Sequence, residues 1–236
     1  MTQLAVVTGA SLGLGAAVSA GLVDAGWSLV IDAREPGPLE AQAGRLRDLA
    51  PPGVTIEVVP GDVADPAHRR ALAAVVARHG RLDLLVNNAS VLGPSPQPAL
   101  AELPLDRLRE VYEVNTLAPL GVMQALAPWL AAAARPRILN ITSDAAVVPY
   151  ERWGGYGSSK AALERITAGW AAENPATTAW ALDPGDLRTR LHQAAFPGQD
   201  ISDRPAPATV VPAIVALVAS DTPSGRFSVT ELLASR

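Results

Sequence analysis

Short apolar segments alternate along the chain with longer stretches whose apolar residues recur at helical spacing. Some of the short segments, Leu4–Val7 for example, are apolar without alternation, as expected for parallel strands buried on both faces. The pattern predicts strands near Leu4–Val7, Ser28–Ala33, Thr55–Val59, Leu82–Val86, Arg137–Thr142, Thr177–Leu182 and Arg226–Val229, and helices near residues 14–25, 38–49, 66–79, 106–133, 157–173 and 208–219. This order predicts an α/β fold, in which about seven strands form a doubly wound parallel sheet with helices on both faces. We expect a single domain over residues 1–236.

Two stretches, Gly93–Pro98 and Phe196–Pro207, are rich in proline and glycine and show no period. They could be solvated loops. They could also line an active site, because loops at the carboxyl ends of strands do so in sheets of this kind. We therefore predict a substrate-loop region over about residues 186–207.

Composition excludes several classes of protein. The formal net charge of −4, from 23 acidic and 19 basic side chains, provides no electrostatic footprint for nucleic acid. Apolar residues at 49% and charged residues at 18% exclude a chain that is disordered throughout. The absence of cysteine excludes disulfides and thiolate chemistry. His68, His79 and His192 lack metal-ligand spacing, so no metal site is expected.

No membrane association is predicted either. The longest lipid-like run, Val210 to Ala219, contains Pro212 and is far shorter than a membrane span. No basic region precedes the apolar segment Leu4–Val7, so no secretory signal is visible. We expect a cytoplasmic protein.

A glycine-rich loop, Thr8–Gly15, follows the first predicted strand and opens the first predicted helix. In that context glycines allow a tight turn and a close approach of backbone N–H groups to a pyrophosphate, and the helix N-terminus adds partial positive charge. The alternative is a purely structural connection. We predict a nucleotide site that includes Gly9, Ser11, Leu12, Gly13, Leu14 and Gly15.

Seven motifs in one order give the chain a resemblance to a known family. They are Thr8-Gly-x3-Gly-x-Gly15, Gly61-Asp62-Val63, Asn87-Asn88-Ala89, Asn115, Ser143, Tyr156-x3-Lys160 and Pro184-Gly185-x3-Thr189. Over about residues 3–190 the sequence resembles the short-chain dehydrogenase/reductase family. The resemblance implies a Rossmann-type sheet of order 3-2-1-4-5-6-7, a nicotinamide dinucleotide, and hydride transfer to or from a small carbonyl or secondary alcohol substrate. The alternatives are a non-catalytic dinucleotide sensor and an epimerase or dehydratase on a related scaffold.

The end of the second strand should select the dinucleotide. By the family's spacing the selecting position is Ala33, followed by Arg34. A carboxylate there would bind a ribose 2′-OH, whereas an arginine accommodates a 2′-phosphate. Asp32 is one residue early and should point to the opposite face. We therefore expect NADP(H) to be favoured over NAD(H).

The resemblance implies further cofactor contacts. Asp62 and Val63 would contact adenine, although an aspartate there could simply stabilise a turn. Asn88 and Ala89 would lie beside the cofactor, and Ser90 replaces the family's glycine next to them. After the sixth strand, Pro184, Gly185 and Thr189 would hold the nicotinamide carboxamide, although Pro-Gly is also an ordinary turn signal.

Tyr156 and Lys160 are four residues apart at the start of a predicted helix and therefore share a face. An unperturbed tyrosine has a pKa of about 10. A nearby ammonium and the helix dipole should lower that pKa and make the phenol a usable acid–base catalyst. Lys160 is the only lysine among the 19 basic residues, and a compact ammonium suits a ribose and a phenolate together. An exposed i,i+4 pair is the alternative.

The remaining candidates complete the predicted catalytic group. Ser143 would hydrogen-bond the substrate oxygen, with Thr142 as a rival. In the family the residue at the position of Asn115 holds a water that connects to the lysine; a helix-packing amide is the alternative. Segments that could form the substrate pocket contain Leu92, Tyr150, Trp153, His192 and Phe196.

The resemblance also implies a homodimer or homotetramer that pairs the helices near 106–133 and 157–173, with Leu163 and Trp170 as candidate contacts. The chain departs from the family after Gly225, where the usual Asp-Gly-Gly is missing. The final strand is therefore open to question.

Overall fold

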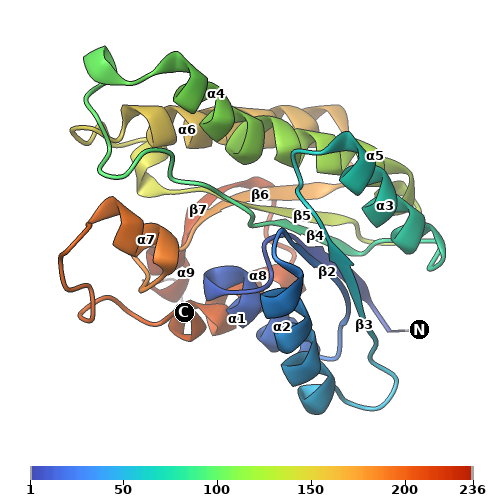
Figure 1. The fold of residues 1–236 in the computed structure, drawn as a ribbon. Coiled ribbons are helices and arrows are strands. Elements are labelled where there is room, and N and C mark those ends of the chain that lie inside the picture. Colours follow the sequence, from blue (N-terminus) through green and yellow to red (C-terminus); the bar gives the residue numbers. More distant parts are fainter. Residues whose placement is uncertain (1, 235–236) are drawn as a thin grey trace.

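Seven parallel strands form one sheet in a computed structural model that describes residues 2–234 (Figure 1). Their order, β3-β2-β1-β4-β5-β6-β7, confirms the expected topology. The strands are β1 (Leu4–Val7), β2 (Ser28–Ala33), β3 (Ile56–Pro60), β4 (Leu84–Asn87), β5 (Arg137–Ile141), β6 (Thr178–Asp183) and β7 (Gly225–Ser228). The final strand forms and pairs parallel with β6, although it lacks the family's usual residues.

Helices cover both faces of the sheet, with α3 to α6 on one face and α1, α2, α8 and α9 on the other (Figure 1). The helices are α1 (Gly13–Asp24), α2 (Pro36–Leu49), α3 (Pro66–Ala77), α4 (Leu105–Tyr112), α5 (Ala118–Ala131), α6 (Gly154–Glu173), α7 (Arg190–Ala195), α8 (Val211–Ala219) and α9 (Val229–Ala234). Short 3₁₀ turns lie at Leu100–Glu102, Asp144–Ala146 and Pro207–Val210.

The double covering explains why β1 is apolar at every position. In β1, Leu4 and Val6 pack into the core beneath α3 and α5, whereas Ala5 and Val7 pack into the core beneath α1 and α8. Because successive side chains of a strand point to opposite faces, a sheet buried on both sides needs apolar residues at both. Each predicted strand end lies within two residues of the end observed in the structure.

The predicted helix over residues 106–133 is in fact two helices. A π-helical turn, Glu113–Leu117, separates α4 from α5 and contains the buried Asn115. Helices α7 and α9 were not predicted, and α7 forms inside the expected substrate loop. Leu163 is only 1% exposed within the chain, so it is wrong as a candidate subunit contact.

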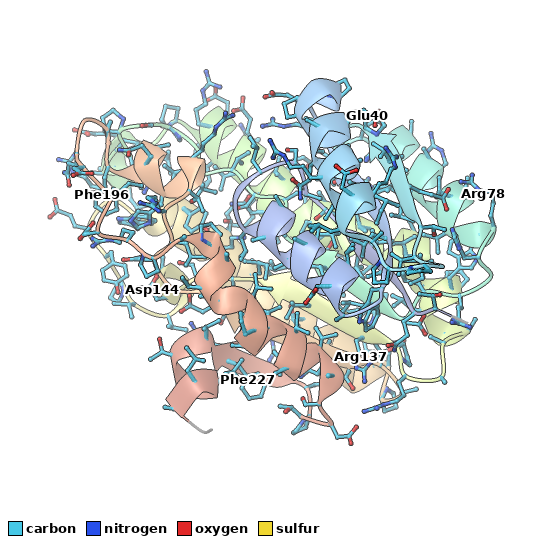
Figure 2. All side chains as sticks on the ribbon, turned by 90° about the horizontal axis from the view of Figure 1, so that it is seen from below. Glu40, Arg78, Arg137, Asp144, Phe196 and Phe227 are labelled. Carbon is cyan, nitrogen blue, oxygen red and sulfur yellow. The ribbon has the colours of Figure 1, made fainter. Side chains whose placement is uncertain are left out.

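The carboxyl ends of the strands gather at one end of the molecule. Figure 2 shows Asp144, which follows β5, and Phe196, which follows α7, on that side, and Arg137, the first residue of β5, away from it. Among residues 2–234, no helix is long and apolar enough to cross a membrane.

Candidate active site

A cavity of about 840 Å³ opens at the carboxyl ends of the strands. It is lined by most of the predicted site residues, namely Gly9, Ser11, Leu12, Gly13, Leu14, Ala33, Arg34, Asp62, Val63, Asn88, Ala89, Ser143, Tyr156, Lys160, Pro184, Gly185 and Thr189. Two predicted site residues, Gly15 and Asn115, lie behind this lining. Tyr150, Trp153, His192 and Phe196 also line the cavity, whereas Leu92 does not.

The glycine-rich loop is shaped by close backbone approaches. Gly9 has φ +65°, and a Cβ there would lie 2.9 Å from Ala89 Cα. A Cβ on Gly15 would lie 2.3 Å from the Gly9 carbonyl oxygen, so Gly15 permits the packing of α1 against the loop rather than a ligand contact. The Asn88 amide donates to the carbonyls of Thr8 (2.9 Å) and Gly9 (3.1 Å) and ties this loop to the end of β4.

The N-terminus of α1 is available to an anion. The capping position, Leu12, supplies no side-chain acceptor, and the first turn contains no acidic residue. The first N–H groups of a helix lack intrahelical partners and carry partial positive charge. Gly13 has φ +59°, and a Cβ there would lie 3.5 Å from Thr189 Cγ2, so the loop forms a narrow cradle suited to a diphosphate.

Asp32 and Ala33 point to opposite faces, as strand alternation predicts. The Asp32 carboxylate accepts from the Gly9 N–H (2.9 Å) and contacts His68 Nε2 (2.9 Å) on α3. Burial raises the pKa of Asp32, and the hydrogen bonds to His68 and Gly9 act in the opposite direction. Both oxygens of this carboxylate are therefore engaged by the protein.

The hydrogen bonds of Ser143 and Thr142 distinguish these two candidates for contact with the substrate oxygen. Thr142 donates to Glu164 (2.7 Å) and is buried. Ser143 Oγ donates to Asp144 (3.0 Å) and accepts from the Ala145 N–H (3.2 Å). Both residues line the cavity, but Ser143 is the less buried of the two. Ser143 is thus the better placed of the two rivals.

Arg226 on β7 contacts the backbone of Ser143 and its neighbours beneath the cavity. Arg226 donates to Glu164 (3.0 Å) and to the carbonyl of Ser143 (3.4 Å), and it lies 3.5 Å from Asp183 at the end of β6. Burial raises the pKa of Asp183. The ends of β5, β6 and β7 are thereby connected beneath the cavity.

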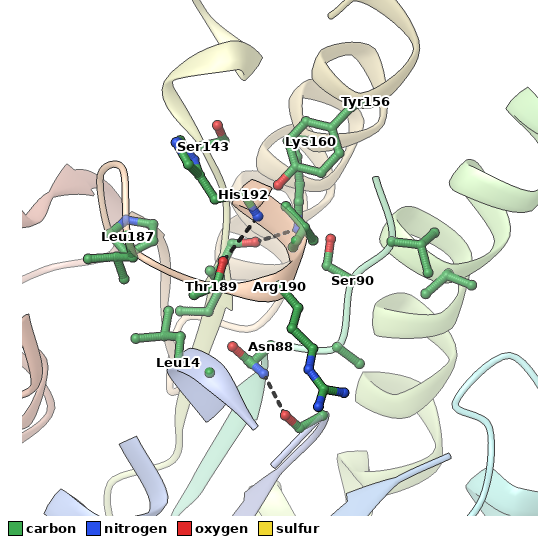
Figure 3. Close-up of a pocket in the computed structure, with 18 of the residues that line it drawn as sticks. Leu14, Asn88, Ser90, Ser143, Tyr156, Lys160, Leu187, Thr189, Arg190 and His192 are labelled. Atoms are coloured by element: carbon green, nitrogen blue, oxygen red, sulfur yellow. Dashed lines mark hydrogen bonds between the residues drawn. The ribbon is translucent and has the colours of Figure 1, made fainter. Parts of the chain in front are cut away.

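Tyr156 and Lys160 lie in the first turns of α6, which begins at Gly154. The Lys160 ammonium donates to the Ile141 carbonyl (2.9 Å) and lies 5.7 Å from the centroid of the Tyr156 ring (Figure 3). Burial lowers the pKa of Lys160 to about 8. Lys160 is therefore a buried cation held between β5 and the tyrosine.

The expected lowering of the Tyr156 pKa is wrong for this structure. Burial raises that pKa above its ordinary value, and the carboxylates of Asp183 and Asp144 raise it further. Only a hydrogen bond with the Ser90 hydroxyl opposes them. Desolvation of a fully buried phenol outweighs the helix dipole, whose effect is small.

Asn115 is a positioning residue in this structure. Its amide donates to the Val91 carbonyl (2.8 Å) and Ser159 Oγ (3.1 Å), and its oxygen accepts from the Val91 N–H (2.8 Å) and Ser90 Oγ (3.1 Å). All four hydrogen bonds that the Asn115 side chain can make therefore connect the segment after β4 to α6. This favours the alternative that Asn115 is a helix-packing amide. Ser90, which replaces the family's glycine, connects this amide to Tyr156.

Thr189 has a structural role in addition to its predicted cofactor contact. Its hydroxyl caps α7 by accepting from the His192 N–H (3.1 Å). Gly185, with φ +75°, turns the chain after β6, and its N–H donates to Asp183 (2.9 Å). Both residues line the cavity.

The two irregular stretches differ in their relation to the cavity. None of the residues Gly93–Pro98 lines it; instead Ser95 donates to the Ala194 carbonyl (2.6 Å) on α7. From the second stretch only Phe196 lines the cavity.

Several residues that line the cavity were not predicted as site residues, among them Asp32, Glu35, Gly61, Ser90, Val91, Val114, Ile141, Asp144, Glu151, Asp183, Asp186, Leu187, Arg190 and Leu191. Arg190 could have been predicted as a site residue from the sequence, because it directly follows Thr189. Its guanidinium points toward the Asn88 end of the cavity (Figure 3). Within residues 2–234 there is no group of acidic or histidine side chains that could hold a metal ion.

Comparison with known proteins agrees with this arrangement. The family model described as short chain dehydrogenase matches residues 3–200. The chain is 36% identical to the 1-deoxy-11-beta-hydroxypentalenate dehydrogenase of Streptomyces arenae, over 79% of this chain and 62% of that protein. It is 32% identical to the L-xylo-3-hexulose reductase of Hypocrea jecorina, over 83% of this chain and 70% of that protein. The match thus spans less than two thirds of the first relative.

A solved structure extends the comparison to the whole fold. The alcohol dehydrogenase of the archaeon Thermococcus sibiricus, complexed with 5-hydroxy-NADP, superposes with a TM-score of 0.86 at 27% identity, over 97% of this chain and 96% of that one. Together with the family match, these likenesses show that the chain belongs to the short-chain dehydrogenase/reductase family.

Proposed function

We propose that this protein is an NAD(P)-dependent oxidoreductase that transfers hydride between a nicotinamide and a small carbonyl or secondary alcohol substrate. The observation that carries the proposal is the convergence of Ser143, Tyr156 and Lys160 on one cavity whose other end is formed by the glycine-rich loop. The loop fits a dinucleotide because Gly9 and Gly13 line the cavity without side chains, and because the uncapped start of α1 can bind an anion. The bound nicotinamide would supply or accept the hydride.

The protein's own residues handle the proton and the substrate oxygen. Tyr156 transfers a proton at its phenol oxygen, and Ser143 donates a hydrogen bond to the substrate oxygen as charge develops there. Ser143 has to turn its hydroxyl away from Asp144 to do so. Lys160, charged and buried beside the phenol, favours the phenolate when the proton leaves and would hold the ribose. Asn115 keeps Ser90 beside the phenol oxygen.

A tyrosine series tests the proposal. Tyr156→Phe should reduce kcat by about 10²–10⁴-fold, the usual contribution of general acid–base catalysis, and leave the Kd for NADPH unchanged. Tyr112→Phe, a change on α4 away from the cavity, is the matched control. Full activity of Tyr156→Phe with a panel of ketones and alcohols would overturn the assignment.

NADP(H) is the proposed cofactor in preference to NAD(H). Arg34 lines the cavity and makes no ion pair with the residues described, while Ala33 presents no carboxylate. The carboxylate of Asp32 is already engaged. Glu35 also lines this end, and of Arg34 and Glu35 only the arginine can bind a 2′-phosphate.

Fluorescence titration tests this preference. Arg34→Ala should weaken NADPH binding by about 10- to 100-fold, from the ~1.5–3 kcal/mol of a charge-assisted hydrogen bond, and change NADH binding little. Tighter binding of NADH than NADPH by the unaltered protein would contradict the preference.

We also propose a homodimer or homotetramer. Leu105 on α4 and Leu117 in the π-helical turn are 65% and 50% exposed, on the helices that the family pairs. Their exposure supports a subunit contact there. Light scattering of the purified protein tests it, and a monomer at micromolar concentration would exclude it.

A further inference from the structure

His192 places an unused hydrogen-bonding atom at the substrate end of the cavity. The residue is 7% exposed, it lines the cavity, and its Nε2 atom is buried without a partner among the residues described. Figure 3 shows it on the same side as Ser143. A buried polar atom left without a partner costs about 1–3 kcal/mol. Such an atom beside the reacting groups therefore indicates a ligand that satisfies it.

The other ring nitrogen indicates what kind of ligand group this is. His192 Nδ1 lies 3.7 Å from the Asp186 carboxylate. A carboxylate favours the tautomer that carries its proton on the facing nitrogen. Nε2 then has a lone pair and accepts, so its partner has to be an O–H or N–H donor.

Aromatic rings surround this atom. The Phe196 ring lies 5.0 Å from the imidazole, between centroids, and Trp153 lies 6.1 Å from Phe196 and 5.8 Å from Tyr156. These faces suit the carbon skeleton of a ligand rather than its polar groups.

The charges at this end disfavour an anion. Asp144 and Asp186 both line the cavity here. Asp144 accepts from the hydroxyls of Ser143 and Tyr150 and has no basic partner among residues 2–234. Asp186 faces Arg204 at 3.8 Å, so it is the Asp144 carboxylate that a carboxylate or phosphate on the substrate would meet as a like charge in a partly desolvated site.

We propose that the substrate carries, besides the reacting carbonyl or alcohol, a second group that donates a hydrogen bond to His192 Nε2, either a hydroxyl or an ammonium, and carries no anionic group. This inference rests on the proposed function and adds the substrate class.

Four ring-matched ketones test the inference: 4-methylcyclohexanone, 4-hydroxycyclohexanone, 4-aminocyclohexanone and 4-oxocyclohexanecarboxylate. At pH 8, with NADPH, kcat/KM should be about tenfold or more higher for the hydroxy or amino compound than for the methyl compound, from one hydrogen bond to a buried acceptor. The carboxylate should be the poorest substrate. The hydroxy and amino arms distinguish the two kinds of donor.

Variants assign the preference to His192. His192→Phe should bring the ratio of kcat/KM for the preferred compound over the methyl compound to about 1, and His192→Gln, which keeps an acceptor, should retain part of it. His79→Phe, a change on the surface beside Glu57, should leave the ratio as it is. The absence of any reduction overturns the proposed function together with the inference. Reduction without a donor preference, a preference for the carboxylate, or a preference that persists in His192→Phe overturns the inference alone.

Discussion

Replacing Lys160 with methionine should make the protein more stable at pH 7. Lys160 is 2% exposed, and burial lowers its pKa from 10.5 to about 8. A charged ammonium at this site therefore costs about 3 kcal/mol at pH 7. Lys160→Met removes that cost but leaves the Ile141 carbonyl without its 2.9 Å hydrogen bond, a loss of about 1–2 kcal/mol. The free energy of unfolding should rise by about 1–2 kcal/mol, while turnover is lost.

The pH dependence of this difference follows from the direction of the shift. Because the pKa of Lys160 is lower in the folded protein, the unfolded chain binds more protons between pH 8 and 10.5. The stability of the unaltered protein therefore rises with pH over this range. The methionine variant lacks this rise, so its advantage should fall by about 2 kcal/mol between pH 7 and about pH 9.5.

Urea unfolding without cofactor, at both pH values, measures the effect. Tyr156→Phe keeps Lys160 and is the matched control, since it should gain stability with pH as the unaltered protein does. A Lys160→Met variant that is less stable than the unaltered protein at pH 7, and by the same amount at pH 9.5, would refute the reasoning. The buried charge would then carry no cost.

Four other substitutions form two pairs with opposite expected outcomes. Ser90→Ala removes the hydrogen bond that lowers the pKa of Tyr156, so the rise of alcohol oxidation with pH should move to higher pH, with about a 2- to 10-fold loss of kcat. Asp144→Asn removes a carboxylate that raises the same pKa and should move that rise to lower pH; a shift in the same direction as that of Ser90→Ala would contradict the assignment. Gly15→Ala places a Cβ 2.3 Å from a backbone oxygen. In thermal unfolding it should lower the free energy of unfolding by about 3 kcal/mol, and in fluorescence titration it should weaken NADPH binding. Gly44→Ala, where a Cβ meets nothing within 4 Å, should instead stabilise α2 by about 0.5–1 kcal/mol.

Local patterns predicted the elements that depend on local rules. Leu4–Val7 and Ser28–Ala33 matched their strands at both ends, because burial on both faces requires a largely apolar run that stops where the strand leaves the core. The π-helical turn around Asn115 was not predictable in this way. An added residue in a helix hardly changes the apolar period, and what holds the turn is a set of hydrogen bonds to Val91 and Ser159, far away in the chain.

Helix α7 shows the same limit in a short segment. Its six residues lie between proline- and glycine-rich stretches and are too few to show a helical period. Thr189 caps it and Ser95, almost a hundred residues earlier, donates to its last turn. Short helices depend on such tertiary contacts rather than on propensity.

By itself, the sequence determined the order of strands and helices, the glycine-rich loop, and the spacing that puts Tyr156 and Lys160 on one helical face, because each depends on residues near one another in the chain. The tertiary structure alone decided the electrostatics of that pair. The helix dipole and a nearby ammonium favour a lowered tyrosine pKa, yet the surrounding fold raises the pKa of Tyr156 and lowers that of Lys160. Desolvation depends on every group packed around a side chain, and those groups come from strands and helices that are distant in sequence.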